Sequence, residues 1–81
     1  MTKEGWKTDR GRVYILYGEP DEVERYPDSE GRKPFEVWKY RNIEGGVDFV
    51  FVDRWKNSNY ELVTSTKRGE LQDPNWEALL H

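Results

Sequence analysis

The sequence predicts a small two-layer α+β domain, in which an N-terminal helix packs on an antiparallel meander of three or four strands and a short C-terminal helix follows. Three observations predict this class. Capping residues frame one short helix near the start, alternating apolar residues separated by turn residues mark several strands, and an Asp-Pro pair opens a last helix. No repeat or linker divides the 81 residues, so we expect a single domain over residues 1–81.

Residues 9–17 are predicted to form the first helix. Thr8 is suited to cap its start and Gly18 to end it. Residues 13–17 also have strand propensity, and periodicity in so short a segment leaves helix and strand both open. The caps favour the helix, because a threonine and a glycine followed by a proline at helical distance are more specific than the propensity of five residues.

Four segments have the alternation of β-strands. They are residues 21–26, 35–41, 47–55 and 60–66. The first alternates weakly and is expected at an edge, whereas the third is the most apolar and is expected inside the sheet. Within the second segment Trp38 and Tyr40 point away from Val37, and within the third Phe49 points away from Val50.

The C-terminal helix is predicted from Asp73 and Pro74. Asp73 is suited to cap the helix and Pro74 to occupy its first position, where a missing N–H costs nothing. Trp76, Leu79 and Leu80 then share one face.

A second apolar stripe lies behind the aromatic one on the predicted sheet. It consists of Val37, Val50, Val52 and Val63, which we treat as a candidate docking face. The C-terminal helix, a part of a longer parent chain or a partner protein could cover it. Alternatively, all four valines are ordinary core residues, because strand register cannot be read from one sequence.

The composition excludes several chemistries. There is no cysteine, and the only histidine is the terminal His81, so a disulfide, a thiolate zinc site and a catalytic triad are not expected. We expect neither a metal nor another cofactor. The formal charge of −3 disfavours nucleic acid, and no apolar stretch approaches the ~18 residues of a membrane span, so we expect no membrane insertion.

The start of the first helix is one candidate binding site. Trp6, Asp9, Arg10 and Arg12 lie there, next to N–H groups that could bind an anion. The alternative is structural: Asp9 supports the cap, Trp6 packs on the sheet edge and Arg10 pairs with a nearby carboxylate.

Two further groups of residues offer chemistry. Acid pairs for glycoside hydrolysis could come from Glu19, Asp21, Asp53 and Glu70, although Asp53 and Arg54 also suit a local ion pair or a turn. Lys67 and Arg68 follow two hydroxyl residues, as a phosphate site would require, but they lack phosphate-loop spacing and suit the end of a strand.

Residues 5–12, which read Gly-Trp-Lys-Thr-Asp-Arg-Gly-Arg, resemble the bacterial GWxTD domain family, which is named after that motif. Residues 13–21, the Trp38-x-Tyr40 pair, residues 49–54 and residues 65–76 match the family pattern as well, so the similarity extends from Gly5 to Leu80. Glu19 replaces a second proline of the family.

The resemblance implies a domain of unknown function within a larger bacterial protein that often carries an export signal, and hence an exported or cell-envelope location. A weaker, architectural similarity is to outer-membrane assembly lipoproteins of the BamE type, in which a helix ending in Gly-x-Pro precedes a three-stranded meander. Similarity of fold alone does not transfer function.

Our leading hypothesis is a non-catalytic interaction or structural module that docks other segments of the parent chain or a protein partner through the valine face or the Trp6 corner. The isolated domain is then expected to be a monomer. The alternative is a carbohydrate-binding or glycoside-hydrolysing domain. A module predicts an apolar strip with scattered carboxylates, whereas a sugar site predicts a concave groove with two aromatic faces and converging acids.

Overall fold

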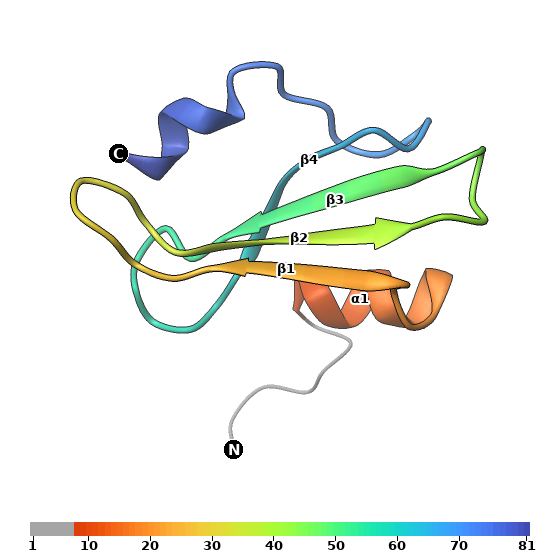
Figure 1. Cartoon of the computed structure of the whole chain (residues 1–81), viewed down its shortest axis with the longest axis horizontal. Coiled ribbons are helices and arrows are strands. Elements are labelled where there is room, and N and C mark those ends of the chain that lie inside the picture. The colour runs from red at the N-terminus through yellow and green to blue at the C-terminus, as the bar shows by residue number, and fades with distance from the viewer. Residues whose placement is uncertain (1–7) are drawn as a thin grey trace.

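The computed structural model describes residues 8–81 and confirms the α+β class (Figure 1). The elements are helix α1 (Asp9–Tyr17), strands β1 (Glu22–Tyr26), β2 (Phe35–Tyr40), β3 (Val47–Val52) and β4 (Glu61–Ser65), and the 3₁₀ helix η2 (Trp76–Leu80). Helix α1 lies on one face of the sheet and η2 on the other (Figure 1).

Helix α1 begins and ends at the predicted caps. The Thr8 hydroxyl oxygen accepts a hydrogen bond from the Gly11 N–H at 2.9 Å. Gly18 has a φ of 85°, and its N–H donates to the Tyr14 carbonyl at 2.8 Å. Val13 is fully buried against the sheet, but Leu16, which shares its helical spacing, is exposed. The helix therefore packs along a narrower stripe than its apolar residues suggest.

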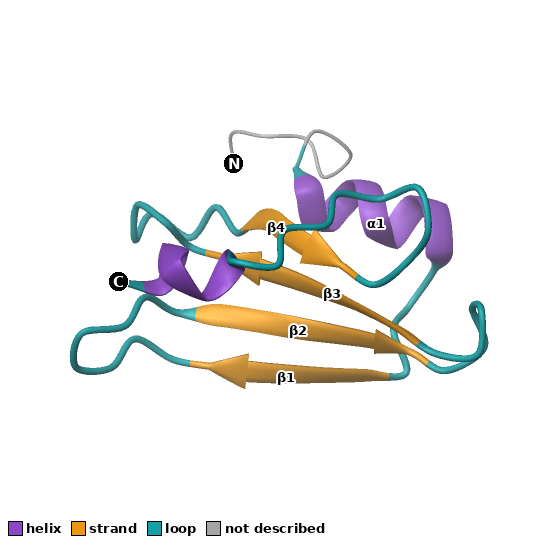
Figure 2. Cartoon of the chain, turned by 90° about the horizontal axis from the view of Figure 1, so that it is seen from above, coloured by secondary structure: helices purple, strands orange, loops and turns teal. Residues whose placement is uncertain are grey.

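The four strands form an antiparallel meander in the order β1-β2-β3-β4, seen from above in Figure 2. β1 is an edge strand and β3 an inner strand, as predicted. The predicted side-chain faces are also correct, because Trp38 pairs with Phe49 on the α1 side and Val37 pairs with Val50 on the other side. β3 ends at Val52, three residues before the predicted end at 55.

The α1 face of the sheet is filled by aromatic rings. Phe49 and Phe51 are fully buried, and the Phe49 ring centroid lies 5.3 Å from that of Tyr17 and 5.6 Å from that of Tyr40. Trp38 packs on Phe51 with the ring centroids 4.9 Å apart. Aromatic rings bury large areas, so they supply a core in a chain that is only 35% hydrophobic.

The chain's own C-terminal helix covers part of the second face. Leu80 joins Phe35, Val50, Val52 and Val63 in one buried cluster, with Trp76 and Leu79 packed against it. Within residues 8–81, the C-terminal helix is thus the segment that packs on the valine stripe, as the first of the three alternatives predicts. Val50, Val52 and Val63 are buried core residues, so the exposed strip of four valines that a docking face would need is not there. Only Val37 remains half-buried.

The C-terminal helix starts later than predicted. It begins at Trp76 with Asn75 as its N-cap, and Asn75 makes no side-chain capping bond. Asp73 instead closes the preceding turn, since its carboxylate accepts the Asn75 N–H at 2.9 Å and its carbonyl accepts the Trp76 N–H at 3.2 Å. The prediction that Asp73 caps the helix and Pro74 begins it is therefore wrong by two residues.

The burial of Leu80 leads to a stability prediction. We expect Leu80→Ala to lower the free energy of unfolding by about 2–5 kcal/mol, because it removes a buried side chain that covers the second face. Leu71→Ala is the matched control, since Leu71 is 54% exposed and its loss should change stability by less than about 0.5 kcal/mol. Urea denaturation measures both, and equal small effects would contradict the role of η2 as a cover.

Candidate functional site

The part of the second sheet face next to η2 is a groove of about 790 Å³. Its floor comes from the strands, and one wall comes from the segment that leads into η2. The lining includes Val37, Val50, Thr64, Thr66, Pro74 and Trp76, together with the charged residues Glu24, Lys39, Asp48 and Asp73.

Strand register builds the groove floor. Glu24 pairs with Val37, Val37 with Val50, and Val50 with Thr64, so one row of side chains crosses all four strands. Directly paired residues of antiparallel strands share a face, and all four side chains therefore line the groove. The row spans three interstrand spacings, which is about 14 Å.

A charged row borders the floor on one side. Lys39 pairs with Asp48 across β2 and β3, and the Lys39 Nζ lies 3.8 Å from an Asp48 carboxylate oxygen. Thr66 holds the backbone of Asp48 by accepting its N–H at 2.8 Å and donating to its carbonyl at 3.0 Å. This row therefore limits how far the apolar floor extends along the strands.

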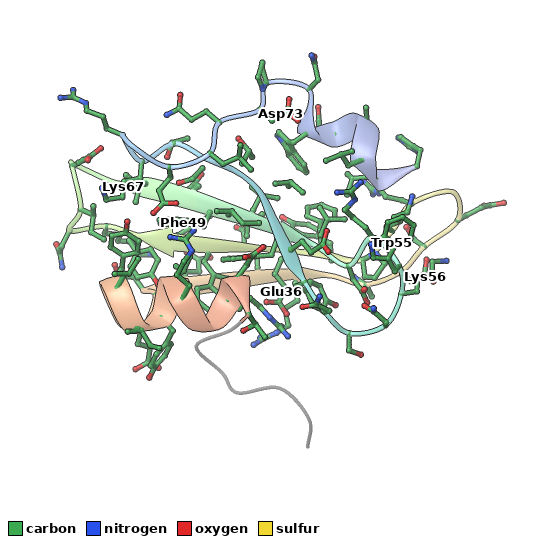
Figure 3. The ribbon with its side chains drawn as sticks, turned by 180° about the vertical axis from the view of Figure 1, so that it is seen from behind. Glu36, Phe49, Trp55, Lys56, Lys67 and Asp73 are labelled. Atoms are coloured by element: carbon green, nitrogen blue, oxygen red, sulfur yellow. The ribbon has the colours of Figure 1, made fainter. Side chains whose placement is uncertain are left out.

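The opposite wall is attached to both the core and the sheet. Trp76 meets the ring of Phe35 edge-on, with the centroids 5.7 Å apart. The Asp73 N–H donates to the Thr64 hydroxyl oxygen at 3.0 Å, which ties the wall to β4. Figure 3 shows Asp73 on this side of the sheet and Glu36 on the α1 side. The groove wall is thus part of the packed domain.

The groove carries more negative than positive charge. Among the described residues, Glu24, Asp48 and Asp73 line it together with one cation, Lys39, and Lys39 already pairs with Asp48. Glu24 accepts a hydrogen bond from the Tyr26 hydroxyl at 2.9 Å. Within residues 8–81, no lysine or arginine forms an ion pair with Glu24 or Asp73.

The candidate binding corner at the start of α1 is occupied by contacts of the fold. Arg10 lies 3.3 Å from the buried carboxylate of Glu36 and 4.4 Å above the ring of Tyr60. Glu36 also accepts the Trp38 indole N–H at 3.1 Å. Arg10 therefore pairs with a nearby carboxylate, as the structural alternative predicts. Trp6 lies outside the described residues.

Asp9 and Arg12 also bind other parts of the domain. Asp9 accepts the Leu62 N–H of β4 at 2.7 Å. Arg12 donates to both carboxylate oxygens of Glu70, at 3.0 and 3.3 Å, and the Tyr17 hydroxyl donates to Glu70 at 2.6 Å. The hydrogen bond from Arg12 is the main reason that the pKa of Glu70 lies below its usual value. The hydrogen bond that Tyr17 donates to Glu70 in turn raises the pKa of the Tyr17 hydroxyl.

Asp53 and Arg54 organise the loop after β3. The Asp53 carboxylate accepts the N–H groups of Asn57 and Ser58, each at 3.0 Å, which explains why β3 ends early. Arg54 lies 3.5 Å from Glu61. Asp53 therefore forms a turn, which is one of the two structural alternatives given for it in the sequence analysis.

Lys67 and Arg68 lie far from that loop. Lys67 lies 3.7 Å from Glu44 and 5.3 Å from the centroid of the Tyr17 ring, and the Arg68 N–H donates to Glu44 at 3.2 Å. Figure 3 shows Lys67 and Trp55 at opposite ends of the sheet. Trp55 directly follows Arg54 in the chain. Arg54 is therefore not part of one basic patch with Lys67 and Arg68.

The four acids proposed for glycoside hydrolysis are not brought together. Asp21 accepts the Arg41 N–H at 2.6 Å, while Asp53 and Glu70 serve the separate contacts described above. None of these acids lines the groove, and neither does the exposed Glu19.

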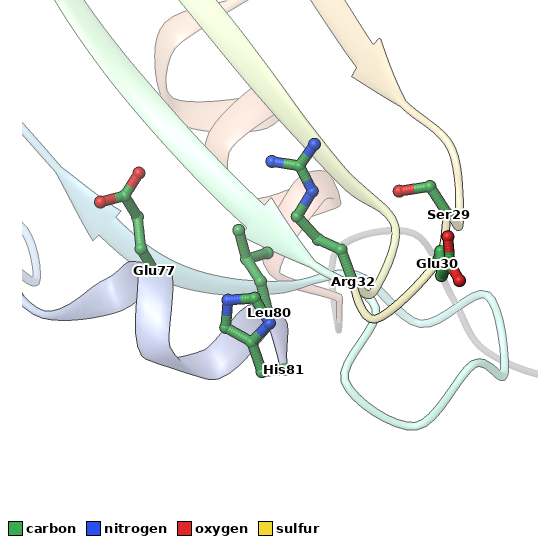
Figure 4. A pocket seen from close by; sticks show the side chains of 6 residues that line it. All are labelled: Ser29, Glu30, Arg32, Glu77, Leu80 and His81. Carbon is green, nitrogen blue, oxygen red and sulfur yellow. The ribbon is translucent and has the colours of Figure 1, made fainter.

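A smaller hollow of about 470 Å³ lies between the β1–β2 loop and η2 (Figure 4). Its lining includes Arg32, Glu77 and His81. The His81 Nδ1 lies 2.8 Å from the Gly31 carbonyl oxygen, so this ring helps hold the C-terminus against the loop. Figure 4 shows Glu77 and Ser29 on opposite sides of Arg32, and their polar atoms do not converge.

Sequence patterns do not identify Glu24, Asp48, Thr64 and Trp76 as residues of one groove. Alternation placed Val37 and Val50 on one face, but the register that aligns Glu24 and Thr64 with them is a long-range property. A β-bulge between Val50 and Phe51 also shifts the pairing with β4, so regular alternation does not predict that Thr64 lies opposite Val50.

Among residues 8–81, no three histidine, aspartate or glutamate side chains gather as a metal site. In the same range, every helix is too short or too polar to cross a membrane.

Comparison with family models matched the one described as the GWxTD domain over residues 1–78. No match was found among curated proteins, and none among solved structures.

The contacts of Glu70 predict a pH dependence. Because folding lowers its pKa, the stability that Glu70 contributes is present above its ordinary value of 4.5 and is lost as the pH falls below it. We expect Glu70→Gln to lower the free energy of unfolding by about 1–2 kcal/mol at neutral pH and by less near pH 3.

Urea denaturation at both pH values measures this difference. The control is Glu19→Gln at an exposed position, which should leave stability unchanged at both. A Glu70→Gln effect that is as large near pH 3 would show that packing, and not ionisation, is what the variant disturbs.

Proposed function

The chain belongs to the GWxTD domain family, and we propose that it is a non-catalytic protein-interaction or structural module of a larger bacterial protein. The resemblance to family members that often carry an export signal supports an exported or cell-envelope location. The partner is another segment of the parent chain or a second protein.

The half-open face of the sheet is the observation that carries this proposal. The α1 face is closed over aromatic rings, and η2 closes the other face around Leu80, in a cluster that includes Val50 and Val52. At the edge of this cluster the half-buried Val37 and Trp76 line an open groove, and the buried Val50 lies at its floor. Apolar surface that is concave and rimmed by polar groups is typical of binding sites.

The roles of three buried or half-buried acids support a non-catalytic function. Glu36 holds Arg10 and the Trp38 indole, Glu70 holds Arg12 and Tyr17, and Asp53 accepts two backbone N–H groups. A general acid or base needs a free position next to substrate. These three carboxylates are used to hold short structural elements together.

Carbohydrate binding is the alternative, and one feature favours it. Trp76 offers an aromatic wall near the hydroxyl groups of Thr64 and Thr66, which suits a sugar ring. Among the described residues that line the groove, however, Trp76 is the only aromatic one, and the acids are distributed around the rim. The two aromatic faces expected of a sugar site are not present in that lining.

A titration separates the two functions. The ¹⁵N-labelled chain is titrated with a degenerate library of uncharged heptapeptides built from valine, isoleucine, leucine, serine and glycine, and separately with oligomers of glucose and of N-acetylglucosamine. We expect the peptides to shift the amide resonances of Val37, Val50 and Thr64. Val37→Lys, which places a cation on the apolar floor, should weaken peptide binding by about tenfold or more.

Leu16→Lys is the matched control, because Leu16 is exposed on α1 at the far side of the sheet and its replacement should not change binding. Val37→Thr keeps a β-branched shape and should weaken binding without unfolding the domain. Shifts caused by the oligosaccharides alone would assign the groove to carbohydrate. If neither probe shifts these resonances, the groove is not the interaction surface and the proposal is wrong.

A further inference from the structure

We propose that the groove binds an extended segment of a partner protein in which a short aliphatic stretch has a lysine or arginine at each end. This inference rests on the proposed function and specifies the chemistry of the partner. It follows from the width of the groove, from the composition of its floor and from the positions of its acids.

The width of the groove selects an extended chain. The apolar row of Val37 and Val50 is bordered on one side by Lys39 and Asp48, two residues further along their strands. Two residues of a strand span about 7 Å. On the other side, the row of Phe35 and Val52 is already covered by η2. A helix about 10–12 Å across is too wide for this floor, whereas an extended chain fits it.

The length of the floor sets the size of the segment. The row from Glu24 to Thr64 is about 14 Å long, and an extended chain of about four residues covers that distance. Successive side chains of such a chain point in opposite directions. One or two of them therefore face Val37, Val50 and the wall residue Trp76, and aliphatic side chains bury most favourably there.

The acids lie at the two ends of the row. Glu24 occupies the β1 end, and Asp73 is tied to Thr64 at the β4 end by the 3.0 Å bond from its N–H. Asp48 faces its own partner Lys39 and contributes little net charge. A cation at each end of the bound segment would thus meet a carboxylate that has no ion pair with a lysine or arginine within residues 8–81.

The charge of the groove disfavours other occupants. Phosphate groups of nucleic acids or lipids would face Glu24 and Asp73, and like charges at short distance repel. The chain as a whole has a formal charge of −3, which also attracts basic partners over longer distances.

The experiment uses two heptapeptide libraries and the ¹⁵N-labelled chain. Both have four central residues drawn from valine, isoleucine, leucine and serine; one carries lysine or arginine at each end of this stretch, and the other carries glutamate. We expect the basic library to bind about tenfold more tightly than the acidic one, to shift the resonances of Val37, Val50 and Thr64, and to lose affinity as salt is added.

Two pairs of substitutions test the acids directly. Glu24→Gln combined with Asp73→Asn removes both charges while keeping an acceptor for the Asn75 N–H, and should weaken binding of the basic library about tenfold. Glu19→Gln combined with Glu30→Gln makes the same change of net charge at exposed positions outside the groove and should have no effect. Glu24→Gln alone should cause part of this loss of affinity. It replaces the double variant if that variant unfolds, because Glu24 lies in β1 and not in the turn that Asp73 closes.

The outcomes separate this inference from the proposed function. Equal binding of the acidic and basic libraries, or basic binding that Glu24→Gln leaves unchanged, would overturn the inference while the groove remains a peptide site. If the uncharged, basic and acidic libraries all leave the groove resonances unshifted, the proposed function fails as well. Shifts of the same resonances with protein concentration alone would assign the groove to a second copy of this chain and would also overturn the inference.

Discussion

The structure depends on one constraint: a four-stranded sheet with two apolar faces must be covered by a chain that has few residues left to cover it. α1 closes one face with Val13 and Tyr17 against a layer of aromatic rings. The 3₁₀ helix η2 has five residues and reaches only the cluster around Leu80. Burial of the larger apolar cluster under α1 favours the folded state, and the groove exists because the smaller cover ends before the sheet does.

Charged side chains compensate for the shortness of the helices and strands. A helix of nine residues is marginal by itself, and here Asp9 binds β4 while Arg10 and Arg12 reach Glu36 and Glu70 on other segments. These contacts join α1 to the sheet and to the chain that follows β4. The charged residues that the sequence offers as candidates for chemistry thus connect segments of the fold. In the described part of the chain, every buried side-chain polar atom has a hydrogen-bond partner.

The same packing determines where a partner can bind. The groove lies on the side of the sheet away from α1, so its lining is independent of the contacts that hold α1 in place. Its floor is built from strand residues in regular register, and its wall is fastened by Asp73 and Trp76. A surface of this kind is formed before a ligand arrives, which lowers the conformational cost of binding.

The sequence by itself determined the local elements of this protein. The caps at Thr8 and Gly18 identified α1, and the alternation of apolar residues identified four strands and the opposite faces of Trp38 and Val37, because capping and alternation depend on neighbours along the chain. Tertiary structure alone decided that Leu80 covers Val52, that Asp53 ends β3 early, and that Glu24, Val37, Val50 and Thr64 form one row. Each of these relations joins residues whose proximity depends on strand register and packing, and the free energy that selects them comes from contacts between segments far apart in the chain.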